Sequence, residues 1–338
     1  MIRRDDAGLS VPNSVKGLLV RPVRMAFAGA LLGTLVLTGC GQAGTTASPA
    51  PAPTATTASA GDFPVTVEAA NGKVTIAKRP QRIVSLSATH TETLFAIGAG
   101  PQVVAVDEQS NHPPEAPKTD LSGFKPNVEA IVAQKPDLVI VSDDIDKIVT
   151  ELGKVNVPVL HQPSATKLDD AYEEIAELGA ATGNKARADE VVAGMKSAME
   201  ELAAKAPKGG ELTYYHELDT TPYAATSQTF IGQIYAMFGL TNIADKAPDA
   251  AGGYPKLSAE FVAQADPDLI FLADVKCCQQ SKDTLAKRPG WQGLSAIKND
   301  RVIQLDDDIA SRWGPRVVEL AETIGAAVAE AGPKAGTS

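Results

Sequence analysis

Two segments that lie far apart in this chain repeat one pattern of residue types. Residues 129–143 (EAIVAQKPDLVIVSD) and 260–274 (EFVAQADPDLIFLAD) each begin with Glu and reach a Pro-Asp pair seven residues later. Four apolar residues follow the pair, and each segment ends with Asp. The pattern predicts a helix, a turn and a buried strand. Two halves built on one plan explain the repetition, and chance similarity between two such units is the alternative.

Short apolar runs alternate with helical segments along most of the chain. We expect strands at residues 83–86, 103–106, 138–141, 157–160, 212–215, 269–272 and 302–305, and helices at 89–98, 128–134, 145–153, 231–238 and 317–330. This alternation is typical of α/β domains with mostly parallel sheets. The expected fold class is α/β, with two Rossmann-like lobes of mostly parallel sheet joined by a long single backbone helix.

The most helical stretch lies between these halves. Residues 169–181 have helical spacing of apolar residues, and Thr182-Gly183-Asn184 interrupts the pattern. Residues 185–206 then continue it, with Met195 and Met199 on one stripe. At 1.5 Å per residue the second piece spans about 33 Å, the breadth of a small domain. A helix of this length crossing once between two lobes would limit their closure.

The N-terminal segment has the layout of an export signal. Arg21 and Arg24 precede an apolar run at residues 25–37 that is too short to span a bilayer stably. The run ends in Leu37-Thr38-Gly39-Cys40, which resembles a bacterial lipobox. Cys40 would then become the lipidated N-terminus after removal of residues 1–39, and an ordinary signal peptide with a chance cysteine is the alternative. The residues that follow carry no Leu, Ile, Val or aromatic side chain up to residue 60, which predicts a disordered tether.

The net charge of the mature chain limits the kinds of partner that it can bind. Removal of residues 1–39 leaves 26 Lys and Arg against 39 Asp and Glu, a net charge of −13. A net negative charge argues against binding to nucleic acid. It also argues against electrostatic binding to anionic lipid as a second means of membrane attachment. Lipid on Cys40 would therefore be the membrane anchor. The expected organisation is a signal peptide at 1–39, a tether at 40–61, an N-terminal lobe at 62–165, an interlobe helix at 166–206, a C-terminal lobe at 207–332 and a tail at 333–338.

Several segments, in this order, resemble the helical-backbone substrate-binding proteins of ABC importers for ferric siderophores and cobalamin. They are residues 83–99 (IVSLSATHTETLFAIGA), 135–140 (KPDLVI), 169–206, 288–291 (RPGW) and 308–316 (DIASRWGPR). The resemblance runs from about Phe63 to Ala331. It implies a monomeric, lipid-anchored receptor outside the cell membrane that binds a large metal chelate between two lobes, with no resident cofactor and no enzyme activity. The implied partner is an ABC permease dimer with its ATPase subunits. The last segment favours a corrinoid such as cobalamin over a ferric siderophore.

The resemblance also implies docking residues. In the family a Glu on each lobe enters arginine pockets of the permease, and the matching positions are Glu92 and Glu260. Both have structural alternatives: Thr89 and Glu92 have capping-box spacing, and Glu260 follows the N-cap candidate Ser258, where a carboxylate suits the helix dipole. Glu129 holds the place of Glu260 in the first repeat, with no docking role implied.

The ligand site is expected between the lobes, at the carboxyl ends of the strands. A bulky chelate needs aromatic faces and a few directional polar groups. The candidates for the faces are Phe124, Tyr223, Tyr254 and Trp313, and those for the polar groups are His216, Asp308 and Arg312. Arg312 is the strongest candidate, because a guanidinium can donate paired hydrogen bonds to siderophore oxygens or to a corrinoid amide or phosphate. A salt bridge to residues 306–308 is the alternative.

Adjacent cysteines follow a predicted strand of the second half. In an oxidising exterior we expect Cys277 and Cys278 to form a vicinal disulfide that stiffens a ligand-contacting loop. Free thiols or a thiolate metal site are the alternatives.

Two other functions stay open at this point. His90, His112, His161 and His216 suggest a zinc or manganese receptor of the same architecture, although no pair has the spacing of neighbours on a helix. A cell-wall hydrolase using carboxylates such as Asp143 and Asp274 is the second. The chain has no Gly-x-Ser-x-Gly elbow and no phosphate-binding loop of ATPases.

Overall fold

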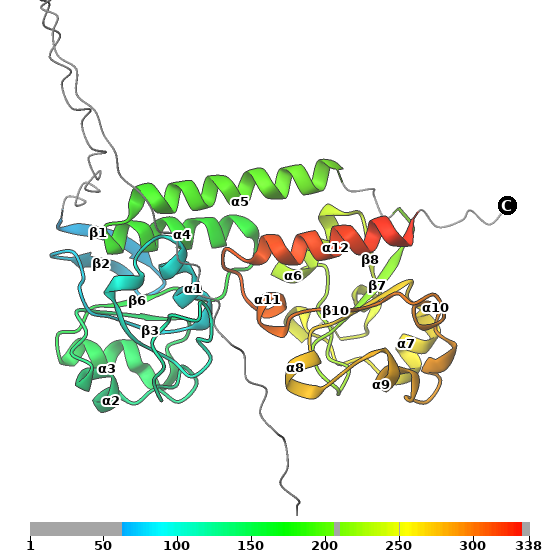
Figure 1. Ribbon diagram of the computed structural model, residues 1–338. Helices are drawn as coiled ribbons and strands as arrows, with labels where there is room; N and C mark the ends of the chain where they lie inside the picture. The colour runs from blue at the N-terminus through cyan, green and yellow to red at the C-terminus, as the bar shows by residue number, and fades with distance from the viewer. Residues whose placement is uncertain (1–62, 206–209, 250, 333–338) are drawn as a thin grey trace, which may run out of the picture. The chain divides into compact units, whose positions relative to one another are not determined.

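Two four-stranded parallel sheets organise the structure, a computed structural model that describes residues 63–205, 210–249 and 251–332 (Figure 1). We call residues 63–165 the N-terminal half and residues 210–332 the C-terminal half. The predicted signal peptide, the tether with Cys40 and the tail at 333–338 lie outside the described residues. The two parallel sheets and their helices confirm the expected α/β class.

The N-terminal sheet has the strand order β4-β3-β5-β6. Its strands are β3 (Ile83–Leu86), β4 (Val103–Val106), β5 (Leu138–Val141) and β6 (Val159–His161), and its helices are α1 (Ala88–Ala96), η1 (Gly100–Gln102), α2 (Val128–Ala133), η2 (Ile145–Lys147) and α3 (Ile148–Lys154). An antiparallel hairpin, β1 (Val65–Ala69) and β2 (Gly72–Ile76), precedes this sheet. The sequence analysis missed the hairpin, although Asn71-Gly72 between two alternating runs is a hairpin signal.

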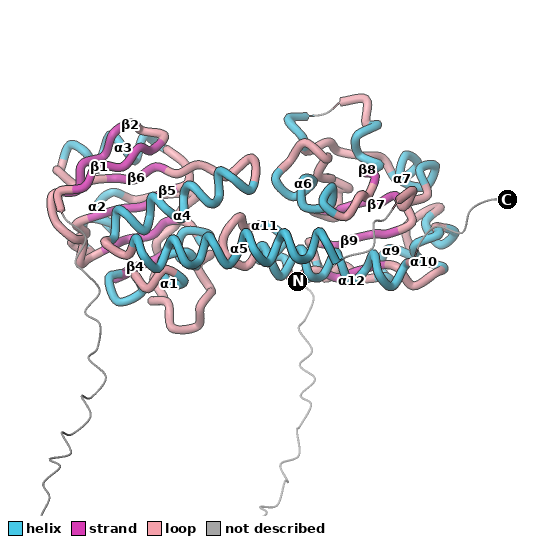
Figure 2. The backbone as a smooth tube through the Cα atoms, turned by 90° about the horizontal axis from the view of Figure 1, so that it is seen from above, coloured by secondary structure: helices cyan, strands magenta, loops and turns pink. Residues whose placement is uncertain are grey.

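The C-terminal sheet has the order β8-β7-β9-β10, which is the topology of the N-terminal sheet. Its strands are β7 (Thr213–Glu217), β8 (Thr241–Asn242), β9 (Leu269–Leu272) and β10 (Val302–Gln304). Its helices are α6 (Phe230–Met237), η3 (Ile243–Lys246), η4 (Ala251–Gly253), α7 (Ala259–Ala265), α8 (Val275–Cys278), α9 (Lys282–Ala286), η5 (Trp291–Gly293), α10 (Ser295–Lys298) and α11 (Asp307–Ser311). Figure 2 shows the strands of both sheets in magenta.

The Asp of the repeated Pro-Asp pair makes equivalent hydrogen bonds in both halves. Asp137 accepts hydrogen bonds from the backbone N–H groups of Gln81 (2.9 Å) and Arg82 (2.8 Å), just before β3. Asp268 accepts from the N–H (2.9 Å) and the hydroxyl (3.0 Å) of Thr213, the first residue of β7. In each half this carboxylate therefore fixes where the neighbouring strand begins, which explains why the repeat keeps an Asp there.

A pair of long helices connects the halves. α4 (Leu168–Thr182) and α5 (Lys185–Lys205) pack against each other, and the C-terminal helix α12 (Val317–Ala331) packs on α5 (Figure 1). One hydrophobic cluster includes buried residues of both sheets and of these three helices, such as Ile175, Met195 and Ile324. The halves therefore share part of their core. Within the described residues, no helix is both long and apolar enough to cross a bilayer.

The α4–α5 contact depends on a small residue. A Cβ added at Gly179 would lie 2.3 Å from the Cβ of Ala188 on α5. We expect Gly179→Ala to push the helices apart and to lower the free energy of unfolding by about 1–3 kcal/mol, as overpacking does. Gly194→Ala on α5 is the control, because no atom lies within 4 Å of its new Cβ, and it should raise that free energy by about 0.5–1 kcal/mol. Chemical denaturation compares the two, and equal effects would contradict the close packing.

Candidate functional site

A cavity of about 310 Å³ has walls from both halves. The N-terminal half contributes residues that follow its strands: Leu86, Ser87, Ala88, Thr89, Asp107, Gln109, Gly123, Phe124, Ser142, Asp143 and Ser164. The C-terminal half contributes Asp308, Ser311, Arg312 and Trp313. The cavity therefore lies at the carboxyl ends of the N-terminal strands, where open α/β sheets bind ligands.

Hydroxyl groups, carboxylates and two aromatic rings give the cavity its character. Phe124 is the most exposed of the large apolar side chains in the described part of the chain, at 66%. Its loop approaches β3 closely, because a Cβ at Gly123 would lie 2.6 Å from the carbonyl oxygen of Leu86, and only glycine fits. Asp107 is buried beneath the cavity, and this burial raises the pKa of its carboxyl although the Ser110 hydroxyl donates a hydrogen bond to it.

The sequence-predicted residues divide into two groups. Phe124, Asp308, Arg312 and Trp313 line the cavity, so the structure brings these four together. Residues that the sequence analysis did not name include Asp107, directly after β4, and Ser142, directly after β5. Their position at strand ends is the signal that could have identified them.

Arg312 lines the cavity, but its guanidinium is bound by protein groups. Its Nη1 donates to Asn111 Oδ1 (3.0 Å) and to Glu92 Oε1, and its Nη2 donates to Gln109 O (3.0 Å) and Asp308 Oδ1 (2.8 Å). Three of these acceptors belong to the N-terminal half. The salt bridge to residues 306–308, which the sequence analysis kept as the alternative, is therefore present at Asp308. In this conformation the guanidinium of Arg312 is not free to donate the expected paired hydrogen bonds to a ligand.

Glu92 is not placed as the docking prediction requires. Its side chain is only 2% exposed, and its carboxylate accepts hydrogen bonds from Arg312 and from Arg316 (2.6 and 2.8 Å). The capping-box alternative is also wrong, because α1 begins after Ser87 rather than after Thr89. Glu260, in contrast, is exposed in the first turn of α7, whose N-cap is Ser258.

A second contact across the halves involves His90 and Trp313. The indole N–H of Trp313 donates to Glu174 Oε2 on α4 (2.8 Å), and the ring meets His90 edge-on at 6.0 Å between centroids. His90 is buried, and its Nε2 lies 3.5 Å from the same Glu174 oxygen. This contact fixes the orientation of Trp313 at the cavity wall.

Three predicted ligand contacts lie elsewhere. His216 is fully buried in β7, bonded through Nδ1 to the Tyr235 hydroxyl (2.8 Å), and its burial lowers its pKa to about 4. It is a core residue, because β7 is covered on both faces. Tyr223 and Tyr254 are exposed (39% and 42%) but do not line the cavity.

The remaining histidines do not gather with His216. Among the residues that the structure describes, no group of three or more His, Cys, Asp or Glu side chains is placed to hold a metal ion. The two carboxylates that the hydrolase alternative requires do not lie in one site. Asp143 lines the cavity, whereas Asp274 is fully buried in the C-terminal half and is not part of the lining.

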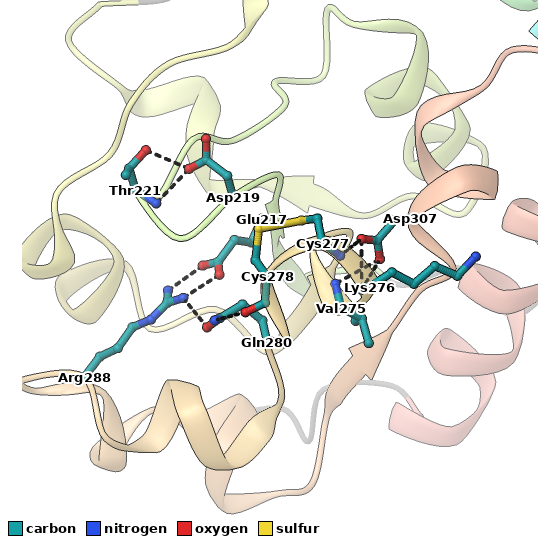
Figure 3. Close-up of a disulfide and its surroundings, with 10 residues drawn as sticks. All are labelled: Glu217, Asp219, Thr221, Val275, Lys276, Cys277, Cys278, Gln280, Arg288 and Asp307. Carbon is teal, nitrogen blue, oxygen red and sulfur yellow. Dashed lines mark hydrogen bonds and ion pairs between the residues drawn. A yellow bond between two sulfur atoms is a disulfide. The ribbon is translucent and has the colours of Figure 1, made fainter. Parts of the chain in front are cut away.

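The sulfur atoms of Cys277 and Cys278 are joined in a disulfide on α8 (Figure 3). The Asp307 carboxylate accepts hydrogen bonds from the backbone N–H groups of Val275, Lys276 and Cys277 (2.9–3.0 Å) and so holds the start of α8. Neither cysteine lines the cavity, so the expected ligand contact of this loop is wrong for this cavity. The loop instead reaches the cavity through Lys276, which bonds to Asp308 (2.9 Å).

A buried acidic pair lies beneath this loop. Glu217 binds Arg288 through two hydrogen bonds (2.5 and 2.6 Å; Figure 3) and accepts one from the Tyr215 hydroxyl (3.0 Å). Burial, together with the charge of the neighbouring Glu217, raises the pKa of Asp274 to about 7. Two carboxylates in one buried site favour sharing a proton.

Two equivalent α/β halves, a shared helical core and a cavity with walls from both halves define a two-lobed binding protein. The chain belongs to the periplasmic binding protein family, whose sequence model matches residues 83–309.

Relatives and solved structures agree with this membership. The chain is 33% identical over 279 residues to YvrC of Bacillus subtilis, an uncharacterized ABC transporter substrate-binding lipoprotein, with 78% of this chain and 86% of the relative covered. It is 30% identical over 307 residues to a cobalamin-binding protein of Halobacterium salinarum, with 88% and 82% covered. The apo periplasmic heme-binding protein RhuT of Roseiflexus sp. RS-1 aligns with a TM-score of 0.66 and 26% identity, with 75% and 99% covered.

The raised pKa of Asp274 predicts a pH-dependent stability. The folded protein holds this proton between about pH 4 and about pH 7, whereas the unfolded chain has lost it, so wild-type stability falls as pH rises through this window. Asp274→Asn cannot ionise and should gain up to about 4 kcal/mol relative to wild type between about pH 4 and about pH 8, because folding raises the pKa of this carboxyl from 3.8 to about 7. Urea denaturation across this range measures the difference. Gly194→Ala, which changes no ionisable group, should show a constant difference, and a constant difference for Asp274→Asn would contradict the shared proton.

Proposed function

We propose that this protein is the substrate-binding component of an ABC importer and that it binds a large metal chelate in the cavity between its halves. The observation that carries the proposal is the joint lining of the cavity by strand-end residues of one half and residues 308–313 of the other. Lipid on Cys40 would hold the protein at the outer face of the cell membrane. The lipobox-like segment and the printed description of YvrC as a lipoprotein support this anchor. The mechanism is binding and release, without covalent chemistry.

A corrinoid such as cobalamin is the ligand that we favour, with a ferric siderophore as the alternative. Phe124 and Trp313 offer aromatic faces to a flat ligand, and the hydroxyls of Ser87, Thr89 and Ser142 offer partners to amide groups. A ligand larger than about 310 Å³ would extend beyond the cavity. The cobalamin-binding relative supports the same choice.

The two halves should close only slightly on the ligand. α4, α5 and α12 form one packed layer that both sheets share, so a large hinge motion would expose buried side chains. The Glu92–Arg312 ion pair and the edge-on contact of His90 with Trp313 already join the halves at the cavity. Ligand entry then requires rearrangement of side chains and loops rather than wide opening.

Glu129 and Glu260 are the docking pair that we propose for the permease. The family resemblance asks for one Glu on each half, and the buried Glu92 cannot fill that place without leaving its arginines. Glu129 and Glu260 are both exposed in the first turn of the equivalent helices α2 and α7. Equivalent positions on equivalent helices would suit a partner built from two similar subunits.

The aromatic wall can be tested by substitution. Phe124→Ala should weaken chelate binding about tenfold, because an aromatic contact of this kind is worth about 1–2 kcal/mol. Val155→Ala is the matched control, since Val155 is another exposed apolar side chain (48%) and does not line the cavity. Titrations would follow tryptophan quenching by cyanocobalamin, a ferric hydroxamate, a ferric catecholate and haem. Trp291 is buried in the C-terminal half and provides the background signal. Absence of binding by all four ligands would overturn the proposed function.

The docking pair can be tested without touching the cavity. The double variant Glu129→Lys, Glu260→Lys should bind the chelate as wild type does but should reduce its uptake at least tenfold, because like charges would face the permease arginines. The measurement is chelate uptake by cells that carry the variant as their only copy of the receptor. Glu322→Lys with Glu330→Lys changes the net charge equally at exposed positions of α12 and serves as control. Normal uptake by the first variant would remove the docking assignment.

A further inference from the structure

Glu92 has a position that the proposed function does not use. It belongs to α1 of the N-terminal half, yet both of its cationic partners, Arg312 and Arg316, come from the C-terminal half. The Arg316 Nε donates to Oε2 (2.8 Å) and its Nη2 to Oε1 (2.6 Å), and Arg312 Nη1 donates to Oε1. One buried carboxylate therefore binds two guanidinium groups across the halves.

The cavity contains little uncompensated positive charge as a result. Among the described residues that line it, Arg312 is the one cation, and Asp107, Asp143 and Asp308 are the anions. Both Nη atoms of Arg312 donate to protein acceptors, including the carboxylates of Glu92 and Asp308. Lys276, just outside the lining, donates to Asp306 (2.7 Å) and Asp308 (2.9 Å). A negatively charged ligand would thus meet carboxylates and an arginine that is already paired.

We propose that Glu92 determines the charge specificity of the site: by holding Arg312, it keeps this cation from acidic ligand groups and selects neutral or cationic chelates over anionic ones. The inference rests on the proposed function and names the substrate class of the same cavity. Glu92 does not line the cavity itself, so it acts through Arg312 as a positioning residue.

Replacement of Glu92 by Gln would leave Arg312 at the cavity with one carboxylate partner fewer, and Arg316 without the carboxylate that it binds. A buried guanidinium without its partner is costly, and an anionic ligand group would then supply the missing charge. At separations of a few ångströms in a partly buried site, one unit charge is enough to change affinity about tenfold or more. The same change should do little for a neutral ligand, apart from any loosening of the halves.

The test compares two ferric chelates that differ in charge. A ferric tris(hydroxamate) is neutral and a ferric tris(catecholate) is anionic, and both are titrated by fluorescence against full-length wild type and Glu92→Gln. We expect wild type to prefer the neutral chelate, and we expect the variant to shift the ratio of the two dissociation constants toward the anionic chelate about tenfold or more. The gain should shrink with added salt, as an electrostatic effect does.

Three variants separate an effect on specificity from an effect on folding. Glu217→Gln removes a buried carboxylate from another arginine pair, that with Arg288, and should leave the ratio unchanged. Adding Arg312→Gln to Glu92→Gln should return the ratio to the wild-type value. If Glu92→Gln does not fold, Asp308→Asn removes the other carboxylate on Arg312 at a partly exposed position and should shift the ratio in the same direction.

The outcomes distinguish the two proposals. A folded Glu92→Gln variant, or Asp308→Asn in its place, whose ratio stays within about twofold of wild type would overturn the role of Glu92 and leave the proposed function standing. If wild type binds the anionic chelate more tightly than the neutral one, the role of Glu92 is likewise overturned and the proposed function still stands. If wild type binds neither these chelates nor cyanocobalamin nor haem, both proposals are overturned.

Discussion

Hydrophobic packing among α4, α5 and α12 is the interaction on which the rest of the molecule depends. These helices belong to the same buried cluster as strand residues of both sheets, so neither half has a fully separate core. A shared core holds two sheets of equal topology together without a flexible hinge. The position of the cavity follows from this arrangement, because the strand-end loops of one half meet residues 308–313 of the other only when the helices are packed.

Polar contacts between the halves add to the hydrophobic packing of the helices. The cluster of Glu92 with Arg312 and Arg316 and the edge-on contact of His90 with Trp313 both cross between the halves. Buried ion pairs add little net stability, because desolvation offsets most of their attraction, whereas loss of one partner is strongly destabilising. The contribution of such a cluster is therefore better explained by structural specificity than by the free energy of unfolding. Here it specifies the orientation of Arg312 and the charge that a ligand meets.

The parts of this structure that could be predicted are those with local signals. Strand and helix positions follow from apolar runs and capping residues, and the Ser258 cap is where the sequence places it. Glu92 could not be assigned in this way, because its partner Arg312 lies 220 residues away, and the capping-box spacing and the docking role implied by the resemblance already accounted for it. His216 failed for a different reason. Side chains alternate between the two faces of a strand, both faces of β7 are covered, and the sequence alone does not say that a strand-end His points into the core.

The repeated helix–strand unit connects the two ends of the proposed function. In the N-terminal half α2 carries Glu129 and leads into β5, whose far end delivers Ser142 and Asp143 to the cavity. In the C-terminal half α7 carries Glu260 and leads into β9, after which α8 binds Asp307 next to the cavity residue Asp308. Each half therefore places its docking candidate at the start of the unit whose other end approaches the ligand site. A partner that contacts both helices would respond to the separation of the halves, and a ligand in the proposed site would act on that separation because residues of both halves line the cavity.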